Sequence, residues 1–277
     1  MQRNNQAFIF LNPCCGYQFV IPSAFICFTM FNRLFILALA ITIAGISCRT
    51  AYQTQSMQYQ SYRISSSYSK DTGVQQFLAS YRNNVDRTMN AVVGVATESM
   101  DKTQPESTLG NFMVDAMFVM AAEKYNTSVD AAFVNFGGIR LTQLPKGDVT
   151  TGKIFELMPF DNLLILQKMK GAVLQQLLDL AAAKGGWPVA GIKMQIKDKK
   201  AVNVLVGGKP LDPQAEYTIV NSDFIANGGD NADMLRAIPQ ITNGYLMRDA
   251  IFDYIAKLKS QGKSIAANIE NRVSYAQ

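Results

Sequence analysis

Two short stretches decide how the rest of the sequence is interpreted: Asn135-Phe-Gly-Gly-Ile-Arg140 and Asp223-Phe-Ile-Ala-Asn-Gly-Gly-Asp230. In each, a strand is expected to run into a turn made by two glycines. Glycine allows positive φ and leaves the backbone uncovered, so a ligand can approach the main chain at such a turn. Arg140, Phe224 and Asp230 would then face the ligand from fixed positions. This arrangement suits a small molecule with an anionic group and a flat ring.

The first 48 residues are predicted to be a leader that precedes the folded domain. They hold all four cysteines, two basic residues and no acidic ones. From Met30 onward, a basic residue is followed by an apolar run over 34–44, too short for a membrane span, and then by small residues before Cys48. This is the layout of a secretory signal with a lipidated cysteine, so residues 1–29 would be an overlong start and Met30 the true one. The alternative is a hydrophobic leader without lipid.

Residues 49–70 are predicted to be a flexible tether, because they are rich in Ser, Gln and Tyr and almost lack aliphatic residues. Residues 71–277 would then form a single domain of about 200 residues, enough for a sizeable core. The formal net charge of the whole chain is +5, and its one dense basic segment, 197–200, has the composition of a solvated hairpin tip. The sequence therefore does not predict nucleic-acid binding.

Periodic patterns within 71–277 predict interleaved helices and strands. Helices are expected over 74–88, 109–120, 173–181 and 251–258. Strands are expected over 91–96, 131–134, 163–166, 189–196, 201–206, 217–220 and 272–275. Gly185 and Gly186 should end the third of these helices. Because hairpins interrupt strict alternation, we expect an α/β fold of the α+β type, with mixed sheets covered by helices.

The sequence contains no histidine. This absence excludes His-based acid–base catalysis, Ser-His-Asp and Cys-His arrangements, and the imidazole ligands that most zinc sites use. We therefore expect neither catalytic residues nor a metal site in this chain.

Two further segments complete an ordered pattern with the first two. One covers residues 147–162, where a short helix is expected to close on Pro159-Phe-Asp-Asn162. The other is Glu106-Ser-Thr-Leu-Gly-Asn111, followed by Asp115-Ala116. In this order the four segments, within about 92–273, resemble the C-terminal, substrate-binding domain of the 5'-nucleotidase and UDP-sugar hydrolase family. The resemblance implies the fold of that C-terminal domain.

In the resembled family, catalysis belongs to a separate N-terminal metallophosphatase domain, whose two metals are held by Asp, His and Asn. Nothing upstream of Asp71 resembles that domain. The chain is similar to the substrate-binding half alone, so divalent metals and an activated water are expected only on a partner metallophosphatase chain. No cofactor is expected in this chain itself.

The resemblance implies roles for four side chains. Phe160 and Phe224 would stack a nucleobase between them. Asp230 would accept hydrogen bonds from ribose hydroxyls, and Arg140 would contact a phosphate or the ribose side of the ligand. The alternatives are two ordinary core phenylalanines, an Asx turn or helix cap at Asp230, and a surface salt bridge at Arg140.

The other implied site residues are the asparagines and glycines of the same segments. Asn135 and Asn162 would brace either the loops or the ligand with their amides, and the sequence does not separate these roles. The turns themselves would be formed by Gly137, Gly138, Gly228 and Gly229.

The chain also departs from the family pattern. Thr103 stands where the family usually has an arginine, with Lys102 as the nearest cation, so poorer phosphate contacts are expected. Phe136 replaces a common glycine, and Asn231-Ala232 replaces a Gly-aromatic pair. The preference for base or sugar is therefore expected to differ.

Three residues have purely structural explanations at this level. Glu106 and Asp115 are expected on or near a helix start, where a negative charge favours the helix dipole. Trp187, which precedes a proline, is expected to be a packing residue.

The leading hypothesis from the sequence is a bacterial lipoprotein of the periplasm or cell surface that recognises a nucleotide or nucleoside. It would be the recognition half of a 5'-nucleotidase-type hydrolase and act in nucleotide catabolism or salvage with a metallophosphatase chain. Contact with the membrane would be through the lipid anchor only. The alternatives are a non-catalytic nucleoside-binding lipoprotein and a degenerate structural domain.

Overall fold

The computed structural model describes residues 35, 38, 56–63, 65 and 70–276. The chain divides into two units, Met1–Ser69 and Lys70–Gln277, and all elements below belong to the second. The expected start at Met30 and the expected lipidation site Cys48 lie outside the described residues. Residues 56–63 of the expected tether are exposed and form neither helix nor strand. No helix in the described part of the chain is long and apolar enough to cross a membrane.

The second unit interleaves helices and strands, and each predicted helix and strand has a counterpart in it. The helices are α2 Thr72–Met89, α3 Thr108–Lys124, α4 Thr151–Leu157, α5 Gly171–Ala183, α6 Asp223–Ala226 and α7 Met247–Ser260, with short 3-10 helices η1 Phe136–Gly138, η2 Gly229–Asn231 and η3 Asp233–Leu235. The strands are β1 Val92–Ala96, β2 Met100–Asp101, β3 Ala131–Phe133, β4 Gln143–Leu144, β5 Gly147–Thr150, β6 Leu164–Lys170, β7 Val189–Ala190, β8 Ile192–Lys197, β9 Lys200–Val206, β10 Lys209–Pro210, β11 Glu216–Ser222 and β12 Val273–Tyr275.

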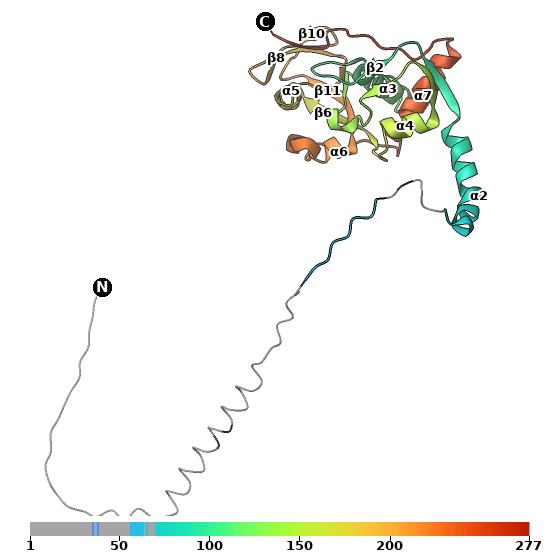
Figure 1. Ribbon diagram of the computed structural model, residues 1–277. Coiled ribbons are helices and arrows are strands. Elements are labelled where there is room, and N and C mark those ends of the chain that lie inside the picture. The colour runs from blue at the N-terminus through green and yellow to red at the C-terminus, as the bar shows by residue number, and fades with distance from the viewer. Residues whose placement is uncertain (1–34, 36–37, 39–55, 64, 66–69, 277) are drawn as a thin grey trace, which may run out of the picture. The chain divides into compact units, whose positions relative to one another are not determined.

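The sheets of this unit are mixed. The main sheet has the order β6-β11-β3-β7, in which β11 runs parallel to β3 and antiparallel to β6. A second four-stranded sheet, β10-β9-β8-β12, pairs β12 with β8 in parallel and β8 with β9 antiparallel. The two-stranded pairs β1-β5 and β2-β4 are also present. Mixed sheets with helices around them confirm the expected α/β fold class (Figure 1).

The main sheet is buried on both faces. Ala132 and Val220 belong to the hydrophobic cluster that includes α3, whereas Ala131 and Ile219 belong to the cluster that includes α5. Successive residues of a strand point to opposite faces, so a sheet covered on both sides needs apolar residues at consecutive positions. This explains why the central strands are continuous apolar runs in the sequence.

The segment expected to form one strand over 189–196 is two strands in different sheets. Gly191, between β7 and β8, has a φ of 74°, and a Cβ at this position would lie 2.2 Å from the carbonyl oxygen of Asp130. The alternation of apolar residues in the sequence continues across this glycine, so the sequence pattern does not show that the chain passes from one sheet to another here. Trp187 is a packing residue as expected, with its ring centroid 6.3 Å from that of Phe133.

The interpretation as a residue near a helix start is wrong for Asp115, whereas Glu106 does directly precede the N-cap of α3 but uses its carboxylate for other contacts. Ser107 caps α3, and Glu106 accepts hydrogen bonds from the backbone N–H groups of Glu270 and Arg272 at 2.8 and 2.9 Å. Asp115 lies in the middle of α3 and accepts from the Arg272 guanidinium at 2.6 and 2.9 Å. Burial opposes the charge of Arg272, but hydrogen bonds to Asp115 and Glu270 raise its pKa above the ordinary value. The two carboxylates tie α3 to the C-terminal segment.

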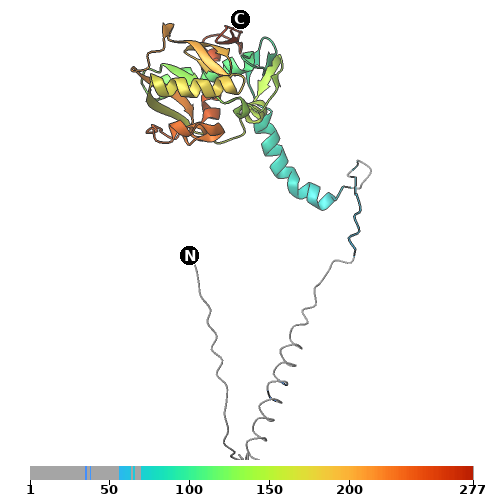
Figure 2. The same ribbon diagram turned by 90° about the vertical axis from the view of Figure 1, so that its left-hand side faces the viewer.

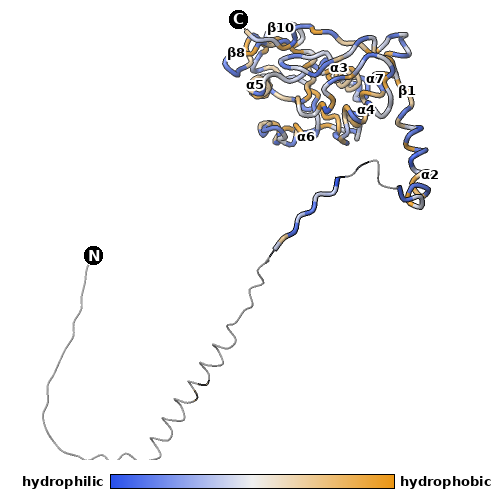
Figure 3. The backbone as a smooth tube through the Cα atoms, in the orientation of Figure 1, coloured by the Kyte–Doolittle hydropathy of each residue, from blue (hydrophilic) through white to orange (hydrophobic). Residues whose placement is uncertain are grey.

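Helix α2 stands apart from the hydrophobic core. It buries none of its residues, and the side chains of Phe77 and Tyr81 are 68% and 61% exposed. Figure 3 shows hydrophobic positions recurring between hydrophilic ones along this helix. In Figure 1 and Figure 2 it extends away from the rest of its unit. The core therefore begins after α2.

Candidate ligand-binding site

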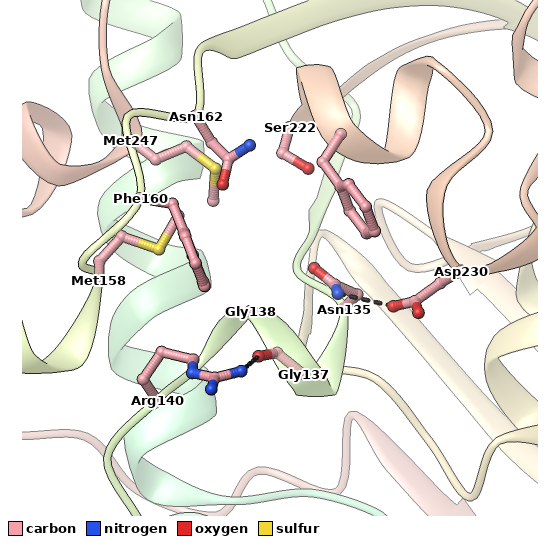
Figure 4. Close-up of a pocket in the computed structure, with 11 residues that line it drawn as sticks. Asn135, Gly137, Gly138, Arg140, Met158, Phe160, Asn162, Ser222, Asp230 and Met247 are labelled. Carbon is pink, nitrogen blue, oxygen red and sulfur yellow. Dashed lines mark hydrogen bonds between the residues drawn. The ribbon is translucent and has the colours of Figure 1, made fainter. Parts of the chain in front are cut away.

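The candidate site lies at one edge of the main sheet. Strands β3 and β11 are parallel and both end at this edge, and the antiparallel strand β6 begins there. The loops at these three strand ends surround a pocket of about 350 Å³ (Figure 4). Its wall is formed by Asn135, Gly137, Gly138, Arg140, Met158, Phe160, Asn162, Ser222, Phe224, Asp230 and Met247.

Most of the residues predicted for a site line this pocket. They are Asn135, Gly137, Gly138, Arg140, Phe160, Asn162, Phe224 and Asp230. The other two, Gly228 and Gly229, line an adjoining hollow that shares Phe224 with the pocket. The sequence analysis missed Met158, Ser222 and Met247. Met158 lies inside the segment 147–162, next to Pro159, and Ser222 directly precedes Asp223, whereas Met247 begins α7 and has no local signal.

Phe160 forms one aromatic wall of the pocket. Its side chain is 43% exposed, unlike that of a core phenylalanine. The buried Arg248, on α7, donates hydrogen bonds to the carbonyl oxygens of Met158 and Phe160 at 3.3 and 3.2 Å and pairs with the Asp161 carboxylate. The Arg248 guanidinium carbon lies 4.3 Å from the ring centroid of Phe155. The loop that carries Phe160 is therefore held by α7.

Phe224 forms a second aromatic wall and is 47% exposed. It lies on the helical turn α6, so the expectation that this strand leads directly into a glycine turn is wrong. For the other motif, β3 is followed closely by the turn η1, which contains Gly137 and Gly138. Ser222 caps α6, its Oγ accepting from the N–H of Ile225 at 3.2 Å. A Cβ on Gly229 would lie 2.5 Å from the Phe224 ring, so this glycine provides space for the ring. Gly228, with a φ of 86°, is the one predicted turn glycine that uses positive φ.

Asp230 has both carboxylate oxygens near polar partners. Its Oδ2 accepts a hydrogen bond from Asn135 Nδ2 at 2.6 Å, drawn as a dashed line in Figure 4. The Nζ of Lys184, the residue that follows α5, lies 3.7 Å from Oδ1. The backbone of Asp230 is left-handed, with a φ of 54°. Its side chain therefore faces Asn135 and Lys184 and caps no helix.

The two asparagines of the wall share one arrangement. Asn162 Nδ2 donates to Asp223 Oδ1 at 2.8 Å, as Asn135 Nδ2 does to Asp230. An ionised carboxylate only accepts hydrogen bonds, so the amide nitrogen of each asparagine must face it. The Oδ1 atoms make no hydrogen bond with the described residues. The nitrogens brace the loops, and the oxygens remain for a ligand.

Comparison of the sequence with known protein families shows which family this chain belongs to. The profile described as 5'-nucleotidase, C-terminal domain, matches residues 87–237, which is more than half of the chain. The chain belongs to this family. Among the residues of the pocket wall, Met247 alone lies outside the matched range.

Relatives of this 5'-nucleotidase C-terminal domain are longer than the chain. Protein UshA of Yersinia enterocolitica is 30% identical over 148 residues, which cover 51% of this chain and 27% of that protein. Cell wall protein Lmo0130 of Listeria monocytogenes is 29% identical over 220 residues, covering 70% of this chain and 28% of that protein. The crystal structure of the 5'-nucleotidase precursor from Thermus thermophilus superposes with a TM-score of 0.64 at 27% identity, covering 75% of this chain and 44% of that one. The chain spans about 27 to 28% of the length of these two curated relatives.

In this 5'-nucleotidase C-terminal domain, Lys102, the cation next to Thr103, contacts Phe136. Lys102 Nζ lies 4.1 Å from the ring centroid of Phe136 and donates to the carbonyl oxygen of Ile139 at 2.7 Å. Burial lowers the pKa of Lys102, and the nearby charge of Arg140 lowers it further. Lys102 is thus held beside Phe136, and Arg140 is the cation of the pocket wall.

Arg140 is available to a ligand. It is exposed and forms no ion pair with the described residues. Its Nη1 lies 3.5 Å from the carbonyl oxygen of Gly137, and its guanidinium carbon lies 5.5 Å from the Phe160 ring centroid. The expected alternative, a surface salt bridge, is not formed within the described chain.

The pocket of this family member combines two half-exposed rings, one carboxylate, two amide oxygens and one guanidinium. Such a set can stack a planar ring, accept hydrogen bonds from hydroxyls and attract an anion. Over residues 70–276 and the shorter described stretches, no three His, Cys, Asp or Glu side chains are grouped as metal ligands. The wall residues are suited to binding.

Proposed function

We propose that this domain binds the nucleoside part of a nucleotide and is the recognition half of a 5'-nucleotidase-type hydrolase. The observation that carries the proposal is that Phe160 and Phe224, 43% and 47% exposed, line the same pocket. Stacking of a base on an aromatic side chain contributes about 1 to 3 kcal/mol. A nucleobase between the rings would cover the apolar surface that both now expose.

The polar groups of the pocket fit the rest of a nucleotide. Asp230 can accept hydrogen bonds from the ribose hydroxyls, and Asn135 Oδ1 offers another acceptor nearby. Arg140 can bind a phosphate through its planar donor fork. Figure 4 shows Arg140 and Asn162 on opposite sides of the pocket. A nucleotide would thus place its phosphate towards Arg140 and the far edge of its base towards Asn162.

Hydrolysis of a phosphate ester in this setting would need metal ions and an activated water. The chain has no histidine, and it covers 27% of Yersinia enterocolitica UshA. We infer that the metals are supplied by a metallophosphatase on another chain and that the pair acts in nucleotide catabolism or salvage. We further infer export and lipid anchoring through Cys48 at the bacterial periplasm or cell surface, and one relative is named a cell wall protein.

A calorimetric titration of the purified full-length protein with adenosine and with AMP, without added metal, tests the proposal. We expect both ligands to bind, AMP more tightly because Arg140 contacts its phosphate. Failure of both to bind would contradict nucleoside recognition and favour a degenerate domain. Release of phosphate from AMP by this protein alone, with Mn²⁺ present, would contradict the separate-chain arrangement. Binding that no metallophosphatase of the family converts into turnover would favour a non-catalytic binding protein.

Gly229→Ala should weaken adenosine binding about tenfold, since stacking on Phe224 is worth about 1 to 3 kcal/mol. The new Cβ would lie 2.5 Å from the Phe224 ring and force the ring to move. Because this ring is exposed, we expect the free energy of unfolding to change by less than about 1 kcal/mol. Calorimetry and urea unfolding measure the two effects. Unchanged affinity would show that the position of the Phe224 ring does not matter.

A further inference from the structure

We propose that Arg248 is the positioning residue that holds Phe160 in place for stacking, although Arg248 itself does not line the pocket. The inference rests on the proposed function, because it concerns the same aromatic wall. Arg248 is outside the residues that match the family profile. Its role follows from its contacts with the loop between α4 and β6.

This loop has no framework of its own. Residues 158–162 belong to neither helix nor strand. The loop is fixed at its ends, where the N–H of Met158 donates to the carbonyl of Ile154 at 2.9 Å and the N–H of Met247 donates to the carbonyl of Asn162 at 2.9 Å. Between these points, the backbone carbonyl of Phe160 is bound by Arg248 at 3.2 Å. Arg248 is therefore the contact that fixes the backbone from which the Phe160 ring projects.

Arg248 is itself rigidly placed. Its side chain is only 9% exposed, and its guanidinium carbon lies 4.3 Å from the Phe155 ring centroid. Its planar guanidinium donates hydrogen bonds to three acceptors in the loop: the carbonyls of Met158 and Phe160 and the carboxylate of Asp161. A lysine has a single point charge and cannot reach all three acceptors in this geometry.

The two aromatic walls are thus held by different means. Phe224 lies on α6, which Ser222 caps, and its ring rests against Gly229. Phe160 depends on a side chain that comes from α7, 88 positions later in the sequence. Without Arg248, the loop would have to become ordered each time a base binds, and that ordering lowers affinity.

The test is a double-mutant cycle with Arg248→Met and Phe160→Ala, measured by equilibrium dialysis with labelled adenosine. Arg248→Met alone should weaken adenosine binding about tenfold through lost stacking. In the Phe160→Ala background, the same change should alter affinity by less than about twofold, because the side chain through which Arg248 acts is gone. The matched control is Arg82→Met on the exposed helix α2, for which we expect unchanged affinity.

Each outcome decides a different point. If the unmodified protein fails to bind adenosine, the proposed function is contradicted, and so is the inference about Arg248 that depends on it. If the unmodified protein binds and Arg248→Met binds equally well, or if the two changes are additive in the cycle, only the role of Arg248 is overturned. Should Arg248→Met not fold, Arg248→Lys keeps the buried charge but reaches fewer acceptors, and it should weaken binding by about threefold or more. Full affinity of a folded Arg248→Lys would contradict the proposal.

Discussion

Replacing both aromatic walls, Phe160→Ala together with Phe224→Ala, is expected to abolish measurable adenosine binding. Each stacking contact is worth about 1 to 3 kcal/mol, so the two together account for about one to four orders of magnitude in affinity. Among the polar groups that remain, Asp230 is only partly buried and Arg140 is exposed to water, so they would not hold a nucleoside by themselves. Isothermal calorimetry with the full-length protein measures the loss.

The double variant has a matched control within the same chain. Phe77 and Tyr81 are also an exposed aromatic pair, with ring centroids 5.7 Å apart, but they lie on α2. Phe77→Ala with Tyr81→Ala removes a similar exposed aromatic surface and should leave adenosine affinity unchanged. Both double variants should keep the unfolding midpoint of the unmodified protein, because all four rings are exposed. Adenosine binding that survives in Phe160→Ala, Phe224→Ala would refute aromatic stacking as the basis of recognition.

The largest expected effect on stability comes from Glu106→Ala. The Glu106 side chain accepts hydrogen bonds from Asn111 Nδ2 at 2.7 Å and from the backbone N–H groups of Glu270 and Arg272. Removing the carboxylate leaves the two backbone donors without a partner, although Asn111 Nδ2 keeps its hydrogen bond to the carbonyl oxygen of Asn268 at 2.8 Å. Each buried unsatisfied donor costs about 1 to 3 kcal/mol. We expect the free energy of unfolding, measured with urea, to fall by about 3 kcal/mol or more.

Glu270 supplies the comparison for this prediction. It belongs to the same cluster and pairs with Arg272 at 3.0 Å, but its side chain is 52% exposed. An exposed ion pair contributes about 1 kcal/mol or less, so Glu270→Ala should have a small effect. Equal losses for the two variants would mean that the backbone hydrogen bonds of Glu106 are not what holds the C-terminal segment.

The pocket could be anticipated because its motifs are local and, in their order, resemble those of a known family. The loops that carry Phe160, Phe224 and Asp230 each contain a short run of glycine, proline or aspartate next to an apolar strand. Such runs can be recognised in the amino-acid sequence without a structure. The strand order then brings these loops to one edge of the main sheet. The mixed fold class was also predictable, since the helices and strands of the core have strong periodicity.

The contacts that hold the pocket in place could not be anticipated. Arg248 meets the carbonyl of Phe160 across 88 positions, and Arg272 meets Asp115 across 157, so no local pattern links either pair. A helical turn of four residues such as α6 is too short to show a period. The break at Gly191 was hidden for the opposite reason, because the apolar alternation continues through it. The residues that line the pocket can therefore be predicted from local sequence, whereas the contacts that hold them in place depend on tertiary packing.

Helix α2 has a consequence for how the protein would respond to proteases. A segment that buries none of its residues can unfold locally without disturbing the core, and cleavage requires such local unfolding. Digestion within 72–89 would leave the sheets, both hydrophobic clusters and the pocket intact, since all of them lie after α2. A single cut in this helix would therefore release the folded domain from everything that precedes it in the chain.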